Sequence, residues 1–129
     1  MTPSLSVRSR LRSAVTAIAR PHGRRVGTPG HYTAEAQLVG RLRELGLEPY
    51  GETFALAYRH DDVRFANLVG VAPGSDRSAQ PVLISAHYDT AGDGPGADSN
   101  AAGVAIALEV ADRLVRAPAT RDVVVALFD

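Results

Sequence analysis

The chain has 129 residues and is 45% hydrophobic, which suits one ordinary globular domain with a buried core. It contains no cysteine, which excludes disulfides, thiolate metal sites and cysteine nucleophiles, so any metal must be bound by His, Asp or Glu. All fourteen basic residues are arginine, and fourteen acidic residues balance them, so net charge indicates no partner.

The N-terminal segment is basic, because residues 1–34 carry six arginines and no acid. Nucleic-acid-binding arms and transit peptides share this property, but the spacing of Leu11, Val15 and Ile18 favours an ordinary amphipathic helix near residues 4–20. We interpret residues 1–24 as a basic helix at the start of a single domain, 1–129. The apolar run AVTAIA is too short for a signal peptide or a membrane span. We therefore expect a cytoplasmic protein that binds neither membrane nor nucleic acid.

The next segments predict a helix and a hairpin. Ala34, Leu38, Leu42 and Leu45 share one helical face, and Gly46 is the expected C-terminal stop. On both sides of the sequence RHDD, hydrophobic residues recur at alternate positions, which predicts two strands of an antiparallel hairpin.

Three segments in the second half predict a parallel crossover. PVLISAH is a short apolar run typical of a strand covered on both faces, NAAGVAIALEVADRLV predicts a helix from Asn100 to Val115, and DVVVALF predicts a second buried strand. In α/β sheets such units place functional groups at the carboxyl ends of the strands. His87 and Asp129 fall at these two ends.

The candidate site is the stretch HYDTAGDGPGADSN, residues 87–100. His87 leaves the first of these strands. Asp89 is two residues further on and can accept a hydrogen bond from the imidazole, which fixes the tautomer that binds a metal. The pair therefore predicts one metal ligand with an orienting carboxylate.

The rest of this stretch is a glycine-rich loop with two more aspartates. Three glycines, Gly92, Gly94 and Gly96, allow a tight turn that would bring Asp98 back toward His87. Asp93 is interpreted as a solvated loop residue. Asp98, Ser99 and Asn100 also precede the helix, and capping is the expected role of Ser99 or Asn100.

The second half of the chain resembles the N-terminal part of the zinc aminopeptidases of metallopeptidase family 28. Three segments carry this resemblance, in the order VLISAHYDT, PGADSNAAGVAIALEVADRL and RDVVVALFD. The segments GTPG, LRELGLEPYGETF and NLVGVAPG are similar to those that precede the site in that family, so the resemblance covers most of residues 25–129. It implies an incomplete three-layer α/β/α sandwich on a mixed sheet, phosphorylase/hydrolase-like, with about four strands and three helices.

The resemblance implies a hydrolase that cleaves N-terminal peptide bonds with a metal-bound hydroxide, using two zinc ions in the complete site. It assigns His87 and Asp98 as metal ligands and Asp89 as the catalytic residue that orients His87. In the family pattern GADDNASG the bridging aspartate aligns with Ser99, so Asp98 has this role only after a shift of one residue. The family holds that aspartate in a non-proline cis peptide. A cis bond between Asp98 and Ser99 is expected if Asp98 is the bridge, and a trans bond if the site is degenerate.

The later ligands and the general base of the family have no counterpart up to Asp129. The two ligands that remain are fewer than the three or four of a stable zinc site. We therefore expect a truncated domain with weak or absent zinc binding, inactive alone, that leaves a sheet edge and an apolar face for a missing half or a partner. The expected substrate is a peptide N-terminus. Two alternatives remain: a non-catalytic binding domain of the same fold, which Ser99 favours, and a one-zinc acyltransferase like glutaminyl cyclase.

Overall fold

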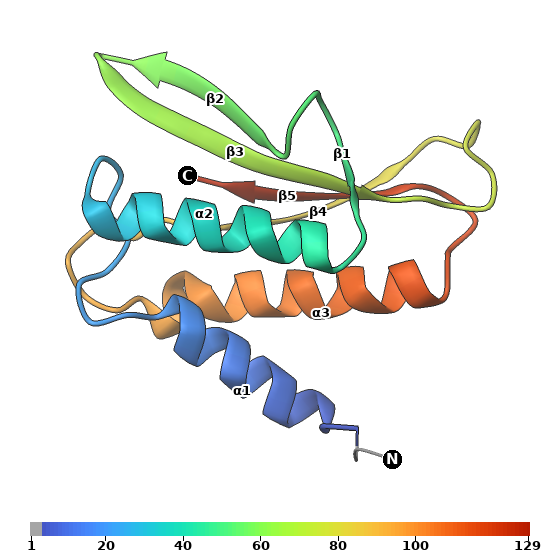
Figure 1. Ribbon diagram of the computed structural model, residues 1–129, viewed down its shortest axis with the longest axis horizontal. Helices are drawn as coiled ribbons and strands as arrows, with labels where there is room; N and C mark the ends of the chain where they lie inside the picture. The colour runs from blue at the N-terminus through green and yellow to red at the C-terminus, as the bar shows by residue number, and fades with distance from the viewer. Residues whose placement is uncertain (1–3) are drawn as a thin grey trace.

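The computed structural model describes residues 4–129, which form a five-stranded mixed sheet and three α-helices (Figure 1). In chain order the elements are α1 Val7–Ile18, α2 Pro29–Glu44, β1 Glu48–Pro49, β2 Ala55–His60, β3 Val63–Ala72, β4 Val82–His87, a π-helical turn Ala97–Ala101, α3 Ala102–Arg116 and β5 Val123–Phe128. Within these residues, no helix combines the length and the apolar character that a membrane crossing requires.

The first two helices begin and end close to their predicted positions. The side chain of Ser6 accepts a hydrogen bond from the Ser9 amide at the start of α1, and Thr28 does the same for His31 at the start of α2. Gly46 follows α2 with a φ of 84°, a left-handed conformation that glycine adopts without strain. The predicted face of α2, Ala34, Leu38, Leu42 and Leu45, is buried.

The sheet contains the predicted hairpin and the predicted crossover. β2 and β3 pair antiparallel through a turn at Asp61 and Asp62, whose φ values of 47° and 61° are both positive, as two-residue hairpin turns require. The strand order is β1-β3-β5-β4, and β4 and β5 run parallel on either side of α3 in the sequence. The short strand β1 was not predicted from the sequence.

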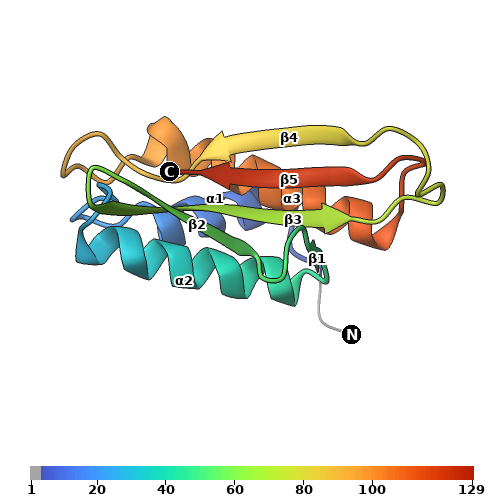
Figure 2. The same ribbon diagram turned by 90° about the horizontal axis from the view of Figure 1, so that it is seen from above.

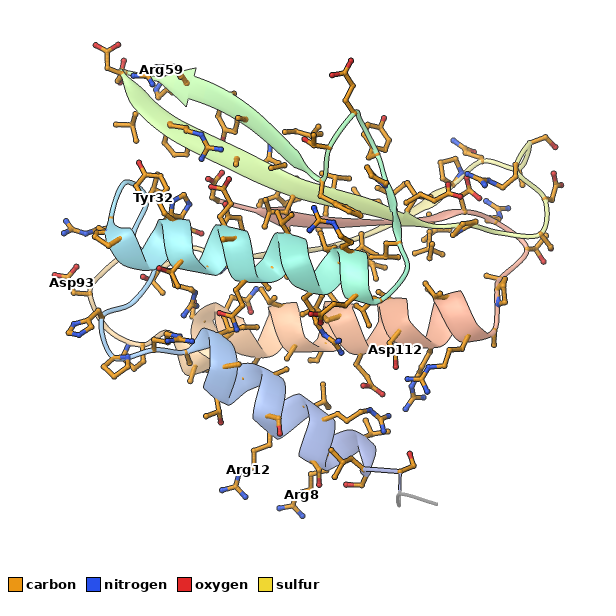
Figure 3. The ribbon with its side chains drawn as sticks, viewed as in Figure 1. Arg8, Arg12, Tyr32, Arg59, Asp93 and Asp112 are labelled. Carbon is orange, nitrogen blue, oxygen red and sulfur yellow. The ribbon has the colours of Figure 1, made fainter. Side chains whose placement is uncertain are left out.

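All three helices lie on the same side of the sheet, with α2 and α3 next to it and α1 beyond α3 (Figures 1 and 2). Arg10 of α1 donates two hydrogen bonds to Glu109 of α3, at 3.0 and 2.6 Å, and so joins the outer helix to the inner layer. Arg8 and Arg12, on the same helix, are exposed and point away from the sheet (Figure 3). Within residues 4–129 the second helical layer of a three-layer sandwich is not formed.

The prediction that the 81–87 strand is covered on both faces is wrong. β4 is the last strand of the sheet, and Val82 and Leu83 are 45% and 58% exposed. A continuous apolar run does not reveal whether a strand is central or at an edge, because side-chain burial depends on neighbours that are distant in sequence. The outer edge of β4 is unpaired, and Leu83 and Phe128, the latter 38% exposed, are apolar side chains on the face of the sheet opposite the helices.

Candidate functional site

The candidate site begins where β4 ends. The parallel register pairs His87 with Phe128, so His87 and Asp129 both lie at the carboxyl ends of these two neighbouring strands. Side chains alternate along β4: His87 is exposed, whereas the next residue, Tyr88, is fully buried. At the carboxyl end of β4, the side chain of His87 therefore lies at the surface and that of Tyr88 lies in the core.

His87 and Asp89 form the predicted pair. The ring Nδ1 of His87 lies 3.1 Å from Oδ1 of Asp89, and the two side chains are 47% and 27% exposed. A carboxylate can only accept a hydrogen bond, so the contact places the ring hydrogen on Nδ1 and leaves the lone pair of Nε2 free. This is the tautomer that a histidine needs to bind a metal through Nε2.

The other predicted ligand, Asp98, lies in the 97–101 turn and is exposed. Among residues 4–129, His, Asp and Glu side chains do not gather in any group of three that could hold a metal ion. The role of Asp98 therefore stays a prediction.

The loop and the start of α3 test three further expectations. The cis peptide bond lies between Ser99 and Asn100, so the expectation of a cis bond between Asp98 and Ser99 is wrong. Asn100 does cap the helix, because its Oδ1 accepts a hydrogen bond from the Gly103 amide at 3.2 Å. Asp93 is exposed at the outer edge of the loop, where it contacts Arg25 at 3.2 Å (Figure 3).

Sequence reasoning missed a buried cluster behind the site. His31 of α2 and Asp129, both with fully buried side chains, are joined by Nε2 and Oδ2 at 3.1 Å. The same Oδ2 accepts a hydrogen bond from the Ala66 amide at 2.6 Å. The ring of His31 stacks on that of Tyr88, with centroids 5.3 Å apart. The sequence indicates only that Asp129 lies at the end of a strand.

Tyr88 ties this cluster to the candidate site. Its hydroxyl donates a hydrogen bond to the Ala66 carbonyl at 2.8 Å and lies 3.3 Å from Asp129. Burial, and then the charge of Asp129, raises the pKa of this hydroxyl far above its usual range, so it stays protonated as a donor. The residue between His87 and Asp89 is thus fixed from the inner face of the sheet.

Residues 67–129 match the family model described as Peptidase family M28. The chain is similar to this family over slightly less than half of its length. The M28 match contains His87, Asp89 and Asp98 and ends at Asp129, so it includes the whole crossover and the glycine-rich loop. Residues 25–66, for which the resemblance was also drawn, lie outside it. No curated protein matches the chain.

Solved structures share the fold of the whole chain. They include the glutaminyl cyclase of Tannerella forsythia, with a TM-score of 0.78 and 19% identity over 98% of this chain and 47% of that one. The glutaminyl cyclase of Porphyromonas gingivalis has a TM-score of 0.72 and 24% identity over 96% and 45%. A proposed zinc-dependent exopeptidase of Bacteroides vulgatus has a TM-score of 0.73 and 18% identity over 98% and 48%. The mixed α/β fold is therefore confirmed, and this chain spans about half the length of these structures.

Proposed function

We propose that the chain supplies the first metal ligand, His87, and its orienting carboxylate, Asp89, to a zinc-dependent enzyme that hydrolyses N-terminal peptide bonds. The contact between His87 and Asp89 at the carboxyl end of a parallel strand carries this proposal. It is supported by the M28 match, which covers both residues. An aminopeptidase of the M28 kind is the function that this arrangement favours.

The residues present fit one part of a zinc site but not a complete one. His87 offers a free Nε2, whereas a stable zinc site takes about three or four protein ligands. The described residues bring no three such groups together. No catalytic step through zinc follows from this chain by itself, and the proposal concerns the complete site to which these residues would belong.

A second candidate function is that of a glutaminyl cyclase. The observation in its favour is that several solved structures sharing the fold are glutaminyl cyclases. The same His87 and Asp89 pair would serve either chemistry, because each would need a histidine ligand to zinc that a carboxylate orients. A protein with a complete site would distinguish them by its product, a released amino acid or a cyclised N-terminal residue.

The 129-residue chain is expected to show no aminopeptidase activity, because its described residues provide fewer than three clustered ligands. The measurement is release of the anilide from a panel of aminoacyl anilides in the presence of zinc. Turnover that disappears in the His87→Ala variant would contradict the prediction. Turnover that persists in this variant would indicate a contaminating enzyme.

Zinc is nevertheless expected to interact with His87 before the other exposed histidines. His60 is the comparison histidine, because its contact with Asp61 at 3.4 Å joins two side chains that are 76% and 90% exposed, so the carboxylate does not fix the ring as Asp89 fixes that of His87. In a zinc titration followed by NMR of the imidazole nitrogens, His87 should respond at a concentration about tenfold lower than His60. The Asp89→Asn variant should remove most of this difference. Equal responses of the two histidines would contradict the proposed site.

The same titration tests which loop residue assists His87. Asp98→Ala is expected to weaken the response of His87, because a carboxylate is a far better zinc ligand than a neutral hydroxyl. Ser99→Ala should leave it nearly unchanged. The opposite pattern would assign the role to Ser99, and no effect of either variant would leave His87 without a second ligand in this loop.

A further inference from the structure

Arg24 is buried, with 1% of its surface exposed, although it belongs to the basic N-terminal segment. Its guanidinium donates hydrogen bonds to main-chain carbonyls at both ends of the loop that follows β4. Nε donates to Tyr88 at 2.6 Å, Nη1 to Pro95 at 2.8 Å and Nη2 to Gly96 at 3.2 Å. Nη1 also donates to Ile18 at the end of α1, at 3.0 Å. One side chain thus joins α1 to both ends of the loop.

The main chain of Arg24 makes two more contacts with this loop. Its amide donates to the hydroxyl of Thr90 at 2.8 Å, and its carbonyl accepts from the Thr90 amide at 3.2 Å. The preceding residue also packs closely, since a Cβ added to Gly23 would lie 2.6 Å from the carbonyl oxygen of Gly94. The segment before α2 therefore packs directly against the loop.

The contacts of Arg24 surround Asp89. Its partners Tyr88 and Thr90 are the two neighbours of Asp89 in the chain. Arg24 bonds to the Tyr88 carbonyl and the Thr90 amide, so the peptide groups on both sides of Asp89 are fixed. Buried guanidinium groups are usually paired with a carboxylate, but the hydrogen-bond acceptors of the Arg24 side chain are carbonyl oxygens. Burial lowers the pKa of Arg24, and the charge of Asp89 opposes this shift. The main-chain carbonyls and the nearby carboxylate together compensate the buried charge.

We propose that Arg24 is a positioning residue, which fixes the loop of residues 88–96 and thereby holds the Asp89 carboxylate against Nδ1 of His87. The meaning of this role for catalysis rests on the proposed function. The geometry itself does not, because it consists of contacts within this chain. The M28 match begins at residue 67, so the proposed positioning residue lies outside the matched residues.

The test is the tautomer of His87, measured by NMR of the ring nitrogens in the metal-free chain at a pH where the ring is neutral. In the wild type the hydrogen should be on Nδ1. In Arg24→Met the loop loses its anchor, and the form with the hydrogen on Nε2 should become the major one. The matched control is Arg25→Met, because Arg25 is 57% exposed and contacts the loop only through Asp93. It should leave the tautomer unchanged.

A purely structural role for Arg24 would lower stability without changing the tautomer in the folded protein. A folded Arg24→Met variant that keeps the hydrogen on Nδ1 would therefore overturn the proposal, as would an equal change in Arg25→Met. If Arg24→Met does not fold, Arg24→Lys, which keeps the charge but loses the planar fork, answers by the same criterion. If that also fails, Thr90→Val removes the acceptor of the Arg24 amide and the hydrogen bond from Thr90 to Gly92, and so tests whether the main chain at Arg24 helps to fix the loop and the tautomer.

The zinc titration separates this proposal from the proposed function. A wild-type chain whose His87 has the expected tautomer but does not respond to zinc would contradict the metal site and leave the role of Arg24 in place. If zinc does bind at His87, Arg24→Met should raise the concentration needed for the response about tenfold, as expected when an orienting contact of a metal ligand is lost.

Discussion

Replacing Asp129 by alanine is expected to lower the free energy of unfolding by about 3–5 kcal/mol, the usual loss when one partner of a buried polar pair is removed. The Asp129 side chain is fully buried, and one of its oxygens accepts from both the Ala66 amide and His31. Alanine would leave these two donors buried without an acceptor, at about 1–3 kcal/mol each. Urea unfolding followed by circular dichroism measures the change.

Asp93→Ala is the matched control, because Asp93 is 77% exposed and its ion pair with Arg25 is a surface contact. Its loss should change stability by less than about 1 kcal/mol. A double-mutant cycle with His31→Ala should give a coupling energy of about 0.5–3 kcal/mol between the two buried side chains. If Asp129→Ala were as mild as Asp93→Ala, the cluster would contribute little to the fold.

Local patterns predicted most of the secondary structure. In the helices and the hairpin, hydrophobic residues recur at a regular spacing that a short stretch of sequence already shows. The residues at this spacing are the ones buried in the fold, as Leu38, Leu42 and Leu108 are. The pair of His87 and Asp89 was also within reach, since the two residues are neighbours in the sequence and follow a recognisable strand. These features depend on residues that are close together in the sequence, so a single sequence is enough to predict them.

The remaining parts of the site depend on contacts between distant segments. Arg24 meets Thr90 across 66 positions, and His31 meets Asp129 across 98. In the sequence Arg24 is one of six arginines in a basic segment, and nothing local distinguishes it from Arg25, which is exposed. Arg24 also connects the end of the first helix to the loop through contacts that are distant in sequence. The exposure of β4 was mispredicted because strand order is a property of the whole sheet.

The largest effect in the glycine-rich loop is expected for Gly96→Ala, with a loss of about 2–4 kcal/mol. Gly96 has a φ of 57°, a left-handed conformation that is unfavourable for alanine. The added Cβ would lie 2.5 Å from Cγ2 of Thr90 and 2.8 Å from the carbonyl oxygen of Ser99. Relief of this overlap would move the Gly96 carbonyl away from Arg24, so the variant should also weaken the contact between His87 and Asp89. Urea unfolding and the His87 tautomer measure the two effects.

Gly92→Ala and Gly94→Ala are the matched controls in the same loop. A Cβ at either position would have no heavy atom within 4 Å, and neither residue has a positive φ. Alanine there should leave the His87 tautomer unchanged and stabilise the chain by up to about 1 kcal/mol, because it restricts the unfolded state. The three glycines look equivalent in the sequence, but only Gly96 is in close contact with the residues that fix the loop. Equal losses at all three positions would mean that general loop flexibility, rather than close packing of Gly96 against Thr90, is what the glycines provide.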